Sequence, residues 1–373
     1  MDNQHTCAVI VPAYNKAPYV NQTLSNLSKL TKEGYKTVIV DDASTDGTKE
    51  IIQEYVAKHP ELKALFMAEN GKKVGAQKLA LNYLPQNIET IIMLDSDSFI
   101  KNPEAIPQAI QKLNEDKKLA GGVFKLEPEG KGLLKHLQDA EYAIGQGFRK
   151  WTSKKGKIRC AAGAGSIYNR KHLENALEEH SGEFLGDDFE LTTIIQDKGY
   201  KMQTFPEVKV GTYVPETWKD KVKQLSGWID GSWRVWHSKR KELGKQIAKP
   251  NRFAVMLALD FTFPVALGYT VGSFVQSVRN LDFSYAYLTG TAAWTALNAA
   301  IAAYGGADKK TIAKAAAYTQ LAVPIAITMY LPATIHAAGK TISRKLKRAT
   351  WEASPRDRLN QFYINNRHAT NRI

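Results

Sequence analysis

Two carboxylates follow the apolar run 90–94, at Asp95 and Asp97, with the small Ser96 between them. An apolar run of this length fits a strand covered on both faces of an α/β sheet, and ligands of such sheets bind beyond the carboxyl ends of the strands. Carboxylates at this spacing can share Mg²⁺ or Mn²⁺, which can bridge the phosphates of a nucleotide. The alternative interpretation is a solvated turn.

A second polar loop follows the apolar run 37–41. Ser44 and Asp46 in this loop are residue types that cap the start of a helix. Capping does not explain Asp41 and Asp42, which stand at the carboxyl end of the predicted strand. A nucleoside would be recognised at that end through hydrogen bonds to its base and ribose, so we expect both aspartates to contact a ligand.

The elements that must position these loops alternate in the first 215 residues, where short apolar runs are separated by helical patterns. Such alternation predicts an α/β fold with a mostly parallel sheet and right-handed crossovers. The small residues of 160–168 are predicted to form a further strand. The five main predicted strands are 7–11, 37–41, 63–67, 90–94 and 121–125.

The composition excludes a disordered chain and leaves room for one large domain with an appendage, because 43% of the 373 residues are hydrophobic and 24% are charged. The two cysteines, Cys7 and Cys160, are too few for a disulfide framework and suit a reducing compartment. Polar residues lead directly into the first predicted strand without a signal segment. We therefore expect a cytoplasmic catalytic domain.

The net charge of +14 gathers in residues 239–252 and in the tail that follows residue 340. Both regions flank apolar stretches, an arrangement that suits an anionic membrane surface. Each stretch is about 22 to 24 residues long, enough to cross a hydrocarbon core of ~30 Å, although each contains polar residues or prolines. A soluble helical bundle is the alternative. The apolar stretches are 253–275, 283–304 and 315–338.

These features predict three parts and a cell (inner) membrane location with the catalytic domain in the cytoplasm. No RNA-binding pattern of interleaved basic and aromatic residues is present, so nucleic acid is not an expected partner. The predicted parts are a cytosolic domain at 1–248, a membrane-associated helical region at 249–340 and a basic tail at 341–373.

An ordered set of four motifs resembles the nucleotide-diphospho-sugar half of family-2 glycosyltransferases. The motifs are Val11-Pro12-Ala13-Tyr14-Asn15, the run 40–48, Asn70-Gly71-Lys72-Lys73 and Asp95-Ser96-Asp97. The resemblance implies a GT-A fold, an inverting reaction and Mg²⁺ or Mn²⁺ on Asp97 and Asp95. The implied nucleotide-binding residues are Pro12, Ala13, Tyr14, Asp41, Asp42, Lys73 and Asp95. For Lys73, a solvated lysine at a helix start is the alternative.

The run 184–192 resembles the acidic motif that supplies the general base in the hyaluronan, chitin and cellulose synthase branch, although Phe189 stands where that motif often has Arg. An inverting transfer needs one carboxylate to take the proton of the acceptor hydroxyl. Asp188 is the predicted base, and Asp187 beside it would raise the proton affinity of either carboxylate. The alternative is acidity that complements the dipole of a helix start.

The run 224–231 resembles the Gln-x-x-Arg-Trp motif of processive members, with Gln224 and Trp228 in place and Gly227 at the Arg position. The resemblance places Asp187, Gln224 and Trp228 at the acceptor and diphosphate. Glycine cannot supply the bidentate phosphate clamp of a guanidinium. Arg234 or Lys223 would have to replace that positive charge.

The sequence therefore predicts an inverting, metal-dependent hexosyltransferase. The expected donor is a nucleotide sugar, UDP-linked, and the expected acceptor is a growing polysaccharide at the membrane lipid surface. A first alternative is transfer of one or a few sugars to a lipid-linked acceptor. A second alternative, motivated by the two missing arginines, is a sugar-nucleotide-binding protein without turnover.

Overall fold

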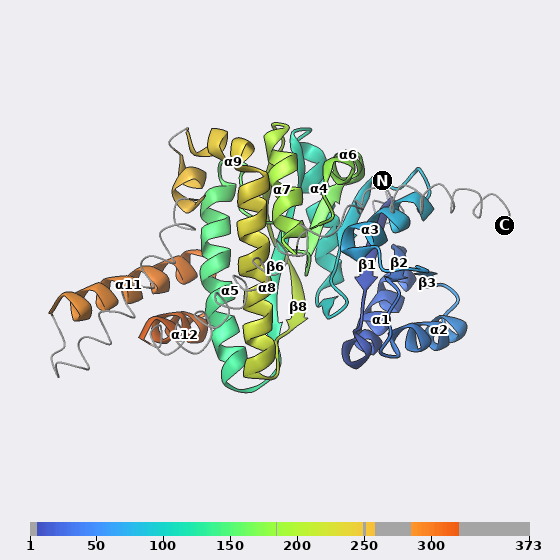
Figure 1. The fold of residues 1–373 in the computed structure, drawn as a ribbon, viewed down its shortest axis with the longest axis horizontal. Coiled ribbons are helices and arrows are strands. Elements are labelled where there is room, and N and C mark those ends of the chain that lie inside the picture. Colours follow the sequence, from blue (N-terminus) through green and yellow to red (C-terminus); the bar gives the residue numbers. More distant parts are fainter. Residues whose placement is uncertain (1–5, 184, 249–250, 258–284, 321–373) are drawn as a thin grey trace, which may run out of the picture.

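A computed structural model describes residues 6–183, 185–248, 251–257 and 285–320, and it contains an eight-stranded sheet with helices on both faces (Figure 1). The sheet order is β3-β2-β1-β4-β7-β6-β8-β5, with β7 and β5 running opposite to the rest. The predicted α/β class and mostly parallel sheet are thus confirmed. The strands are β1 Cys7–Ala13, β2 Lys36–Asp41, β3 Lys63–Phe66, β4 Thr90–Met93, β5 Ser98–Ile100, β6 Leu119–Glu129, β7 Ser166–Asn169 and β8 Lys201–Tyr213.

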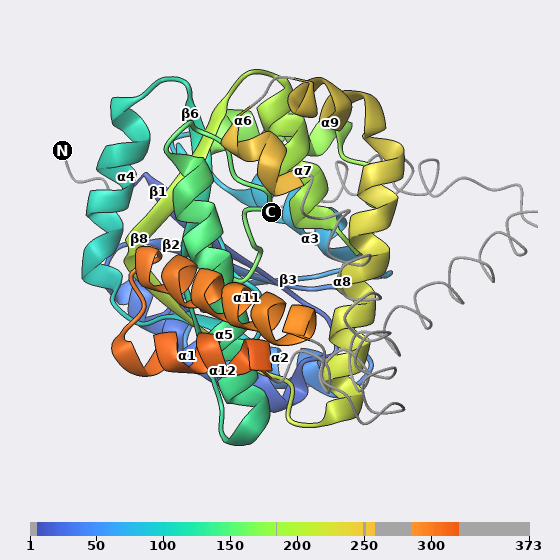
Figure 2. The ribbon, with the colours of Figure 1, turned by 90° about the vertical axis from the view of Figure 1, so that its left-hand side faces the viewer.

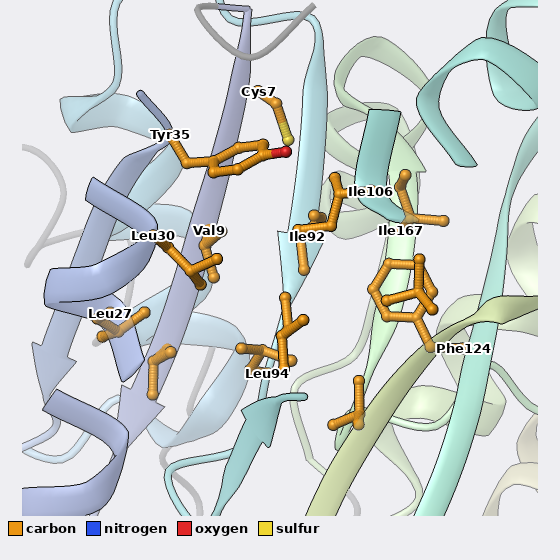
Figure 3. Packing of buried hydrophobic residues seen from close by; sticks show 14 of the residues in the cluster. Cys7, Val9, Leu27, Leu30, Tyr35, Ile92, Leu94, Ile106, Phe124 and Ile167 are labelled. Atoms are coloured by element: carbon orange, nitrogen blue, oxygen red, sulfur yellow. The ribbon is translucent and has the colours of Figure 1, made fainter. Parts of the chain in front are cut away.

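Side chains of the central strands alternate between two hydrophobic cores. Cys7 and Val9 of β1 point into the core that Figure 3 shows, whereas Ala8 and Ile10 point into the opposite core. Helices α1, α2 and α4 cover the first face, and α3, α6 and α7 cover the second. Because both faces are covered, β1 is apolar throughout, and so are residues 38–40 of β2 and 91–93 of β4. The helices are α1 Ala17–Lys32, α2 Thr48–Lys58, α3 Lys72–Tyr83, α4 Ile106–Glu115, α5 Gly132–Ser153, α6 Arg170–Glu179, α7 Asp187–Asp197, α8 Trp218–Ser238 and α9 Arg240–Ile247.

All five main predicted strands are present as β1, β2, β3, β4 and β6. The strand predicted at 160–168 is wrong in its first part, because residues 160–165 form a loop and β7 begins only at Ser166. The sequence reasoning missed β5 and β8. β5 has three residues, and β8 contains Pro206 near a register shift in its pairing with β6, so neither gives a regular apolar pattern.

Two further helices pack against α5 on the side away from β1 to β3 (Figure 2). They are α11 Tyr285–Tyr304 and α12 Lys309–Gln320, and small buried side chains, Ala143, Ala302 and Ala315, fill the contact. A Cβ at Gly147 of α5 would lie 2.1 Å from the backbone oxygen of Ile301. Helix α11 can therefore approach α5 closely only because residue 147 is glycine.

The described residues contain no helix that is both long enough and apolar enough to cross a bilayer. The crossing predicted for 283–304 is therefore not supported. Residues 253–257 of the first apolar stretch join α8 and α9 in a small core with Phe189. The rest of the first stretch (258–275), residues 283–284 of the second, residues 321–338 of the third and the tail 341–373 lie outside the described residues.

Candidate active site at the carboxyl ends of the strands

The loops after β1 and β2 are joined by hydrogen bonds between backbone amides and side chains. The Asn15 amide donates to Ser44 Oγ at 3.0 Å, and the Thr45 amide donates to Asn15 Oδ1 at 2.8 Å. The Ala17 amide donates to Asp46 Oδ2 at 3.1 Å. We call this set of bonds the loop clasp, and it holds the two strand ends in one register.

The loop clasp corrects the helix caps predicted for Ser44 and Asp46. Helix α2 begins after Gly47, whose φ of 92° is the left-handed conformation that glycine adopts readily, and no side chain caps it there. Ser44 instead bonds the first loop, and Asp46 bonds both that loop and the Thr48 amide. The neighbouring loop thus takes the side chain of Ser44 away from α2, whereas Asp46 serves both that loop and the first amide of α2.

Asp41 and Asp42 are both buried but do different work. Asp41 Oδ2 accepts from the Ser44 amide at 3.2 Å, whereas the buried Asp41 Oδ1 has no hydrogen-bond partner among the residues that the structure describes. Asp42 Oδ1 accepts from the Gly71 amide at 2.6 Å, and burial raises the pKa of Asp42 to about 6. Asp41 therefore presents an unused acceptor, and Asp42 holds the loop that leads into α3.

Pro12 and Ala13 form the end of β1, and Tyr14 follows them into the first loop with its ring exposed. The Ala13 carbonyl accepts from the Asp42 amide at 2.8 Å, so the two strand ends stay paired beyond the sheet. These residues thus lie at the carboxyl edge predicted for the nucleotide.

The turn after β4 presents Asp95 and Asp97 at this edge. Thr23 Oγ1 of α1 donates to the Ser96 carbonyl at 2.9 Å and holds the middle of the turn. The carboxylates are 37% and 21% exposed, respectively, so both remain accessible to a ligand. Lys73 Nζ lies 2.8 Å from Asp95 Oδ1, and Lys16 Nζ lies 2.6 Å from Asp97 Oδ2.

The chemistry of this donor set fits a divalent ion whose coordination a nucleotide completes. Asp95 and Asp97 supply carboxylate oxygens, the ligands that Mg²⁺ and Mn²⁺ prefer. Within the described residues no group of three or more His, Cys, Asp or Glu side chains surrounds a metal position. Mg²⁺ keeps waters and commonly takes one or two carboxylates together with substrate phosphates, so two aspartates are sufficient.

Asp188 in the first turn of α7 meets Asp95 through a shared lysine. Lys73 Nζ lies 3.2 Å from Asp188 Oδ1, and the Gly163 amide donates to Asp188 Oδ2 at 2.7 Å. Burial lowers the pKa of Lys73, but Asp188 and Asp95 outweigh that effect and raise it well above its ordinary value. A Cβ at Gly163 would lie 1.9 Å from Lys73 Nζ, so any larger residue at this loop position would displace the Lys73 ammonium.

Asp187 is half-buried, and desolvation raises its pKa to about 7. Its backbone oxygen accepts from His180 Nε2 at 2.9 Å, while His180 Nδ1 accepts from the Gly182 amide at 3.0 Å. These two bonds assign a neutral imidazole with its proton on Nε2, and burial accordingly lowers the pKa of His180. His180 was missed from the sequence, since a lone histidine carries no spacing signal.

Helices α7 and α8 lie side by side (Figure 1), and they meet where Gly231 of α8 packs against Gly186, the residue before α7. A Cβ at Gly231 would lie 2.5 Å from the Gly186 nitrogen, directly before the acidic pair. The same helix carries Gln224 and the 43% exposed Trp228. The motif residues of α8 are therefore attached to the segment that carries the predicted base.

A buried cation beside these motif residues was also missed. Lys221 is fully buried, with Nζ 2.7 Å from Glu141 Oε2, 2.7 Å from Gln138 Oε1 and 3.4 Å from Gln224 Oε1. Its Nζ lies 5.4 Å from the centre of the Trp228 ring. Lys221 differs from the other lysines of this helix only in being buried where α8 packs against α5.

The two cations considered for the Arg position at Gly227 are placed differently from Lys221. Arg234 Nε donates to Asp230 Oδ1 at 3.0 Å, and Lys223 is exposed on α8. The cation next to Gln224 and Trp228 is Lys221, which is too deeply buried to meet a phosphate.

The chain is similar in sequence and in fold to known glycosyltransferases. Residues 8–177 match the family model described as Glycosyl transferase family 2. The chain is 27% identical over 236 residues to "Probable glycosyltransferase YdaM" of Bacillus subtilis, covering 60% of this chain and 54% of that protein. It is 23% identical over 240 residues to an N-acetylglucosaminyltransferase of Rhizobium meliloti, covering 61% and 55%. The chain thus spans about half the length of these relatives.

A third relative is "Dolichyl N-acetyl-alpha-D-glucosaminyl phosphate 3-beta-D-2,3-diacetamido-2,3-dideoxy-beta-D-glucuronosyltransferase" of Methanococcus voltae, 26% identical over 58% of this chain and 70% of its own length. Among solved structures, a mannosyltransferase of Pyrobaculum calidifontis in complex with GDP-Man and Mn²⁺ matches with a TM-score of 0.54 and 19% identity, covering 86% of this chain and 87% of that one. This likeness shows a shared fold. These relatives do not single out the hyaluronan, chitin and cellulose synthase branch.

Proposed function

We propose that the chain is a family-2 glycosyltransferase, an inverting, metal-dependent hexosyltransferase that uses a UDP-linked sugar. The proposal is supported by the match of residues 8–177 to the model of that family and by the fold shared with a solved mannosyltransferase. The observation that carries the proposal is the shared lysine. Lys73 Nζ lies 2.8 Å from Asp95 and 3.2 Å from Asp188, so the end of the site that takes the diphosphate adjoins a carboxylate able to act as a base.

Each side chain at this edge has a task in the reaction. Asp41 Oδ1 accepts from an N–H of the nucleotide base, since it is a buried acceptor with no hydrogen-bond partner among the described residues. Asp95 and Asp97 would hold a divalent ion, which would supply positive charge to offset that of the leaving diphosphate. Lys73 contributes a second positive charge to the diphosphate, and in doing so it leaves Asp188 Oδ1.

Asp188 then takes the proton of the acceptor hydroxyl. The Gly163 amide keeps Asp188 Oδ2 in place at 2.7 Å, so the carboxylate stays oriented while Oδ1 is released. The deprotonated hydroxyl attacks the anomeric carbon from the face opposite the diphosphate, which inverts the configuration. Gln224 and Trp228 would meet the acceptor sugar, because an exposed indole is suited to stack on a sugar ring.

The sugar and the acceptor are proposed from the relatives. Several curated relatives are named N-acetylglucosaminyltransferases, so UDP-N-acetylglucosamine is the first donor to test, with a growing polysaccharide as acceptor. A lipid-linked acceptor is the second candidate. Gly227 in place of the motif Arg favours it, and so does the Methanococcus voltae relative, whose name includes a dolichyl-linked sugar phosphate.

We further propose that the chain works at the inner face of the cell membrane. The support is the sequence alone, in the basic run 239–252 and the apolar stretches that follow it. Flotation of the full chain with vesicles that contain anionic lipid should recover it with the lipid, whereas neutral vesicles should recover much less. Equal absence from both fractions would contradict this location.

The test of the proposed reaction is nucleotide release by the purified full chain from a panel of UDP- and GDP-sugars, with Mn²⁺, Mg²⁺ or EDTA. Release from one UDP-sugar that EDTA abolishes is the expected result. Asp97→Asn should lose it, and the matched control Asp197→Asn, on the exposed end of α7, should keep it. Nucleotide binding without release, with every donor and with saccharide acceptors added, would favour a binding protein instead.

A further inference from the structure

Two lysines contact the carboxylate pair, and each lies at the start of a helix. Lys16 precedes α1, and Lys73 lies in the first turn of α3. Their ammonium groups lie 2.6 Å from Asp97 and 2.8 Å from Asp95. Each carboxylate that would bind the divalent ion therefore has its own positive charge in contact with it.

Neither lysine is explained by local helix preferences. Position 16 is the N-cap of α1, where Ser, Thr, Asp or Asn is preferred, and the Lys16 side chain makes no capping hydrogen bond. A positive charge at a helix start also opposes the helix dipole, and neither α1 nor α3 has an acidic residue in its first turn. A residue that local preferences disfavour indicates a role in the site.

The backbone around Lys16 is held independently of its side chain. The Lys16 amide donates to Thr48 Oγ1 at 2.8 Å as part of the contact between the first two loops. The Lys16 carbonyl accepts from the Tyr19 and Val20 amides at 2.9 and 3.0 Å. The ammonium, on a side chain that is 35% exposed, can thus leave Asp97 without loosening the loop.

We propose that Lys16 and Lys73 are internal counter-ions of the metal-binding aspartates, so that the divalent ion is bound together with the nucleotide diphosphate rather than before it. A free ion must displace an ammonium from each carboxylate and gains little, since their charge is already offset. A diphosphate offers both ammonium groups new partners and supplies further oxygens to the ion. Lys16 is thereby assigned a second role, as a diphosphate-binding residue.

The inference rests on the proposed function, and it is tested by Mn²⁺ binding, followed by electron paramagnetic resonance of the unbound ion. Purified full-length wild type, without nucleotide, should bind Mn²⁺ weakly. Lys16→Gln should bind it roughly threefold to tenfold more tightly, because a partly exposed ion pair no longer competes. Lys29→Gln, at the far end of α1, is the matched control and should leave the affinity unchanged.

Two further variants define the site. Asp97→Asn should abolish the tighter binding seen in Lys16→Gln, which would show that the ion binds at this carboxylate. Lys73→Gln should also tighten Mn²⁺ binding, because Asp95 loses its ammonium. Adding UDP should increase the Mn²⁺ affinity of wild type more than that of Lys16→Gln, and Lys16→Gln should bind UDP in the presence of Mn²⁺ more weakly.

Equal Mn²⁺ affinity in wild type and Lys16→Gln, measured without nucleotide, would overturn the inference whether or not UDP binds. A different pattern would separate it from the proposed function. If Lys16→Gln tightened Mn²⁺ binding but neither UDP nor GDP bound to any form, the counter-ions would stand and the nucleotide-dependent transferase would not.

Discussion

The proposed active site has a donor side and an acceptor side, and the two are built by different means. On the donor side, between β1 and the turn after β4, side chains of one loop bond the backbone of another, as Ser44 and Asp46 do in the loop clasp. On the acceptor side, helices meet through close packing, at Gly186 and Gly231 and around the buried Lys221. The donor side is therefore a set of short polar loops, and the acceptor side is a helix interface.

The match to the family model covers only one of the two sides. The matching segment, residues 8–177, includes every loop of the donor side and ends before Asp188 and α8. Loops that bind a nucleotide can be shared widely, because the diphosphate and base are common to many donors. A helix interface that receives an acceptor can vary with the acceptor. Variants of one side alone can test whether the two sides act independently.

The largest expected effect is that of Asp188→Asn. Removing the proposed general base should lower sugar transfer by roughly 10²- to 10⁴-fold while nucleotide binding with Mn²⁺ persists. Transfer rates and UDP binding by calorimetry would check this. A variant that lost nucleotide binding to the same degree as transfer would contradict the division into two sides.

Lys221→Met should cause the largest loss of stability on the acceptor side. It leaves Glu141 and Gln138 facing a buried apolar side chain, with an expected loss of about 2–4 kcal/mol in the free energy of unfolding. Lys223→Met, two residues along α8 and exposed, should change it by less than about 0.5 kcal/mol. Urea unfolding of both variants makes the comparison, and equal losses would refute the assigned role of the buried cation.

Gly231→Ala should push α8 away from α7. The added Cβ would lie 2.5 Å from the Gly186 nitrogen, so we expect a loss of about 1–3 kcal/mol in unfolding free energy, together with lower transfer activity. Gly244→Ala in α9 has nothing within 4 Å and should gain up to about 1 kcal/mol. Nucleotide binding should survive in both proteins, and its loss in Gly231→Ala would show that the two sides are not separable.

Asp187→Asn should change stability in a pH-dependent manner. The folded-state pKa of about 7 lies above the ordinary value, so the folded protein binds a proton that the unfolded chain releases between about pH 4 and 7. Ionising Asp187 therefore destabilises wild type as pH rises through this window. Asparagine removes that cost, so the variant should gain about 1–2 kcal/mol relative to wild type at pH 8 and nothing at pH 4. Denaturation at both pH values tests the sign.

Ser44→Ala should have the smallest effect and should act on the donor side. It removes the acceptor of the Asn15 amide, with an expected loss of about 0.5–1.5 kcal/mol. The KM for the nucleotide sugar should rise while the KM for the acceptor stays unchanged. Ser153→Ala, at the exposed end of α5, is a suitable control. An acceptor KM that rose equally would break the distinction between the two sides.

Much of the donor side could be predicted because its signals are local. Asp95 and Asp97 follow a continuous apolar run, and Asp41 is the last residue of another strand, so topology alone brings them to one edge. The helix cap predicted for Ser44 was wrong because its partner comes from a loop about 30 residues away in the sequence, and Asp46 bonds both that loop and the Thr48 amide at the start of α2. Capping preferences depend only on neighbouring residues, so they cannot predict hydrogen-bond partners that are distant in the sequence.

The class of sheet, the edge at which the carboxylates gather and the motifs that resemble the family could all be recognised in the sequence, because strand periodicity and loop chemistry depend on neighbouring residues. Three contacts became visible only in the folded structure. Lys73 contacts both Asp95 and Asp188, and Lys16 contacts Asp97. Lys221 is buried beside Trp228. A lysine has the same local signature whether it is solvated or paired. Its partners depend on which distant helices and strands pack together, and that packing is a property of the whole chain.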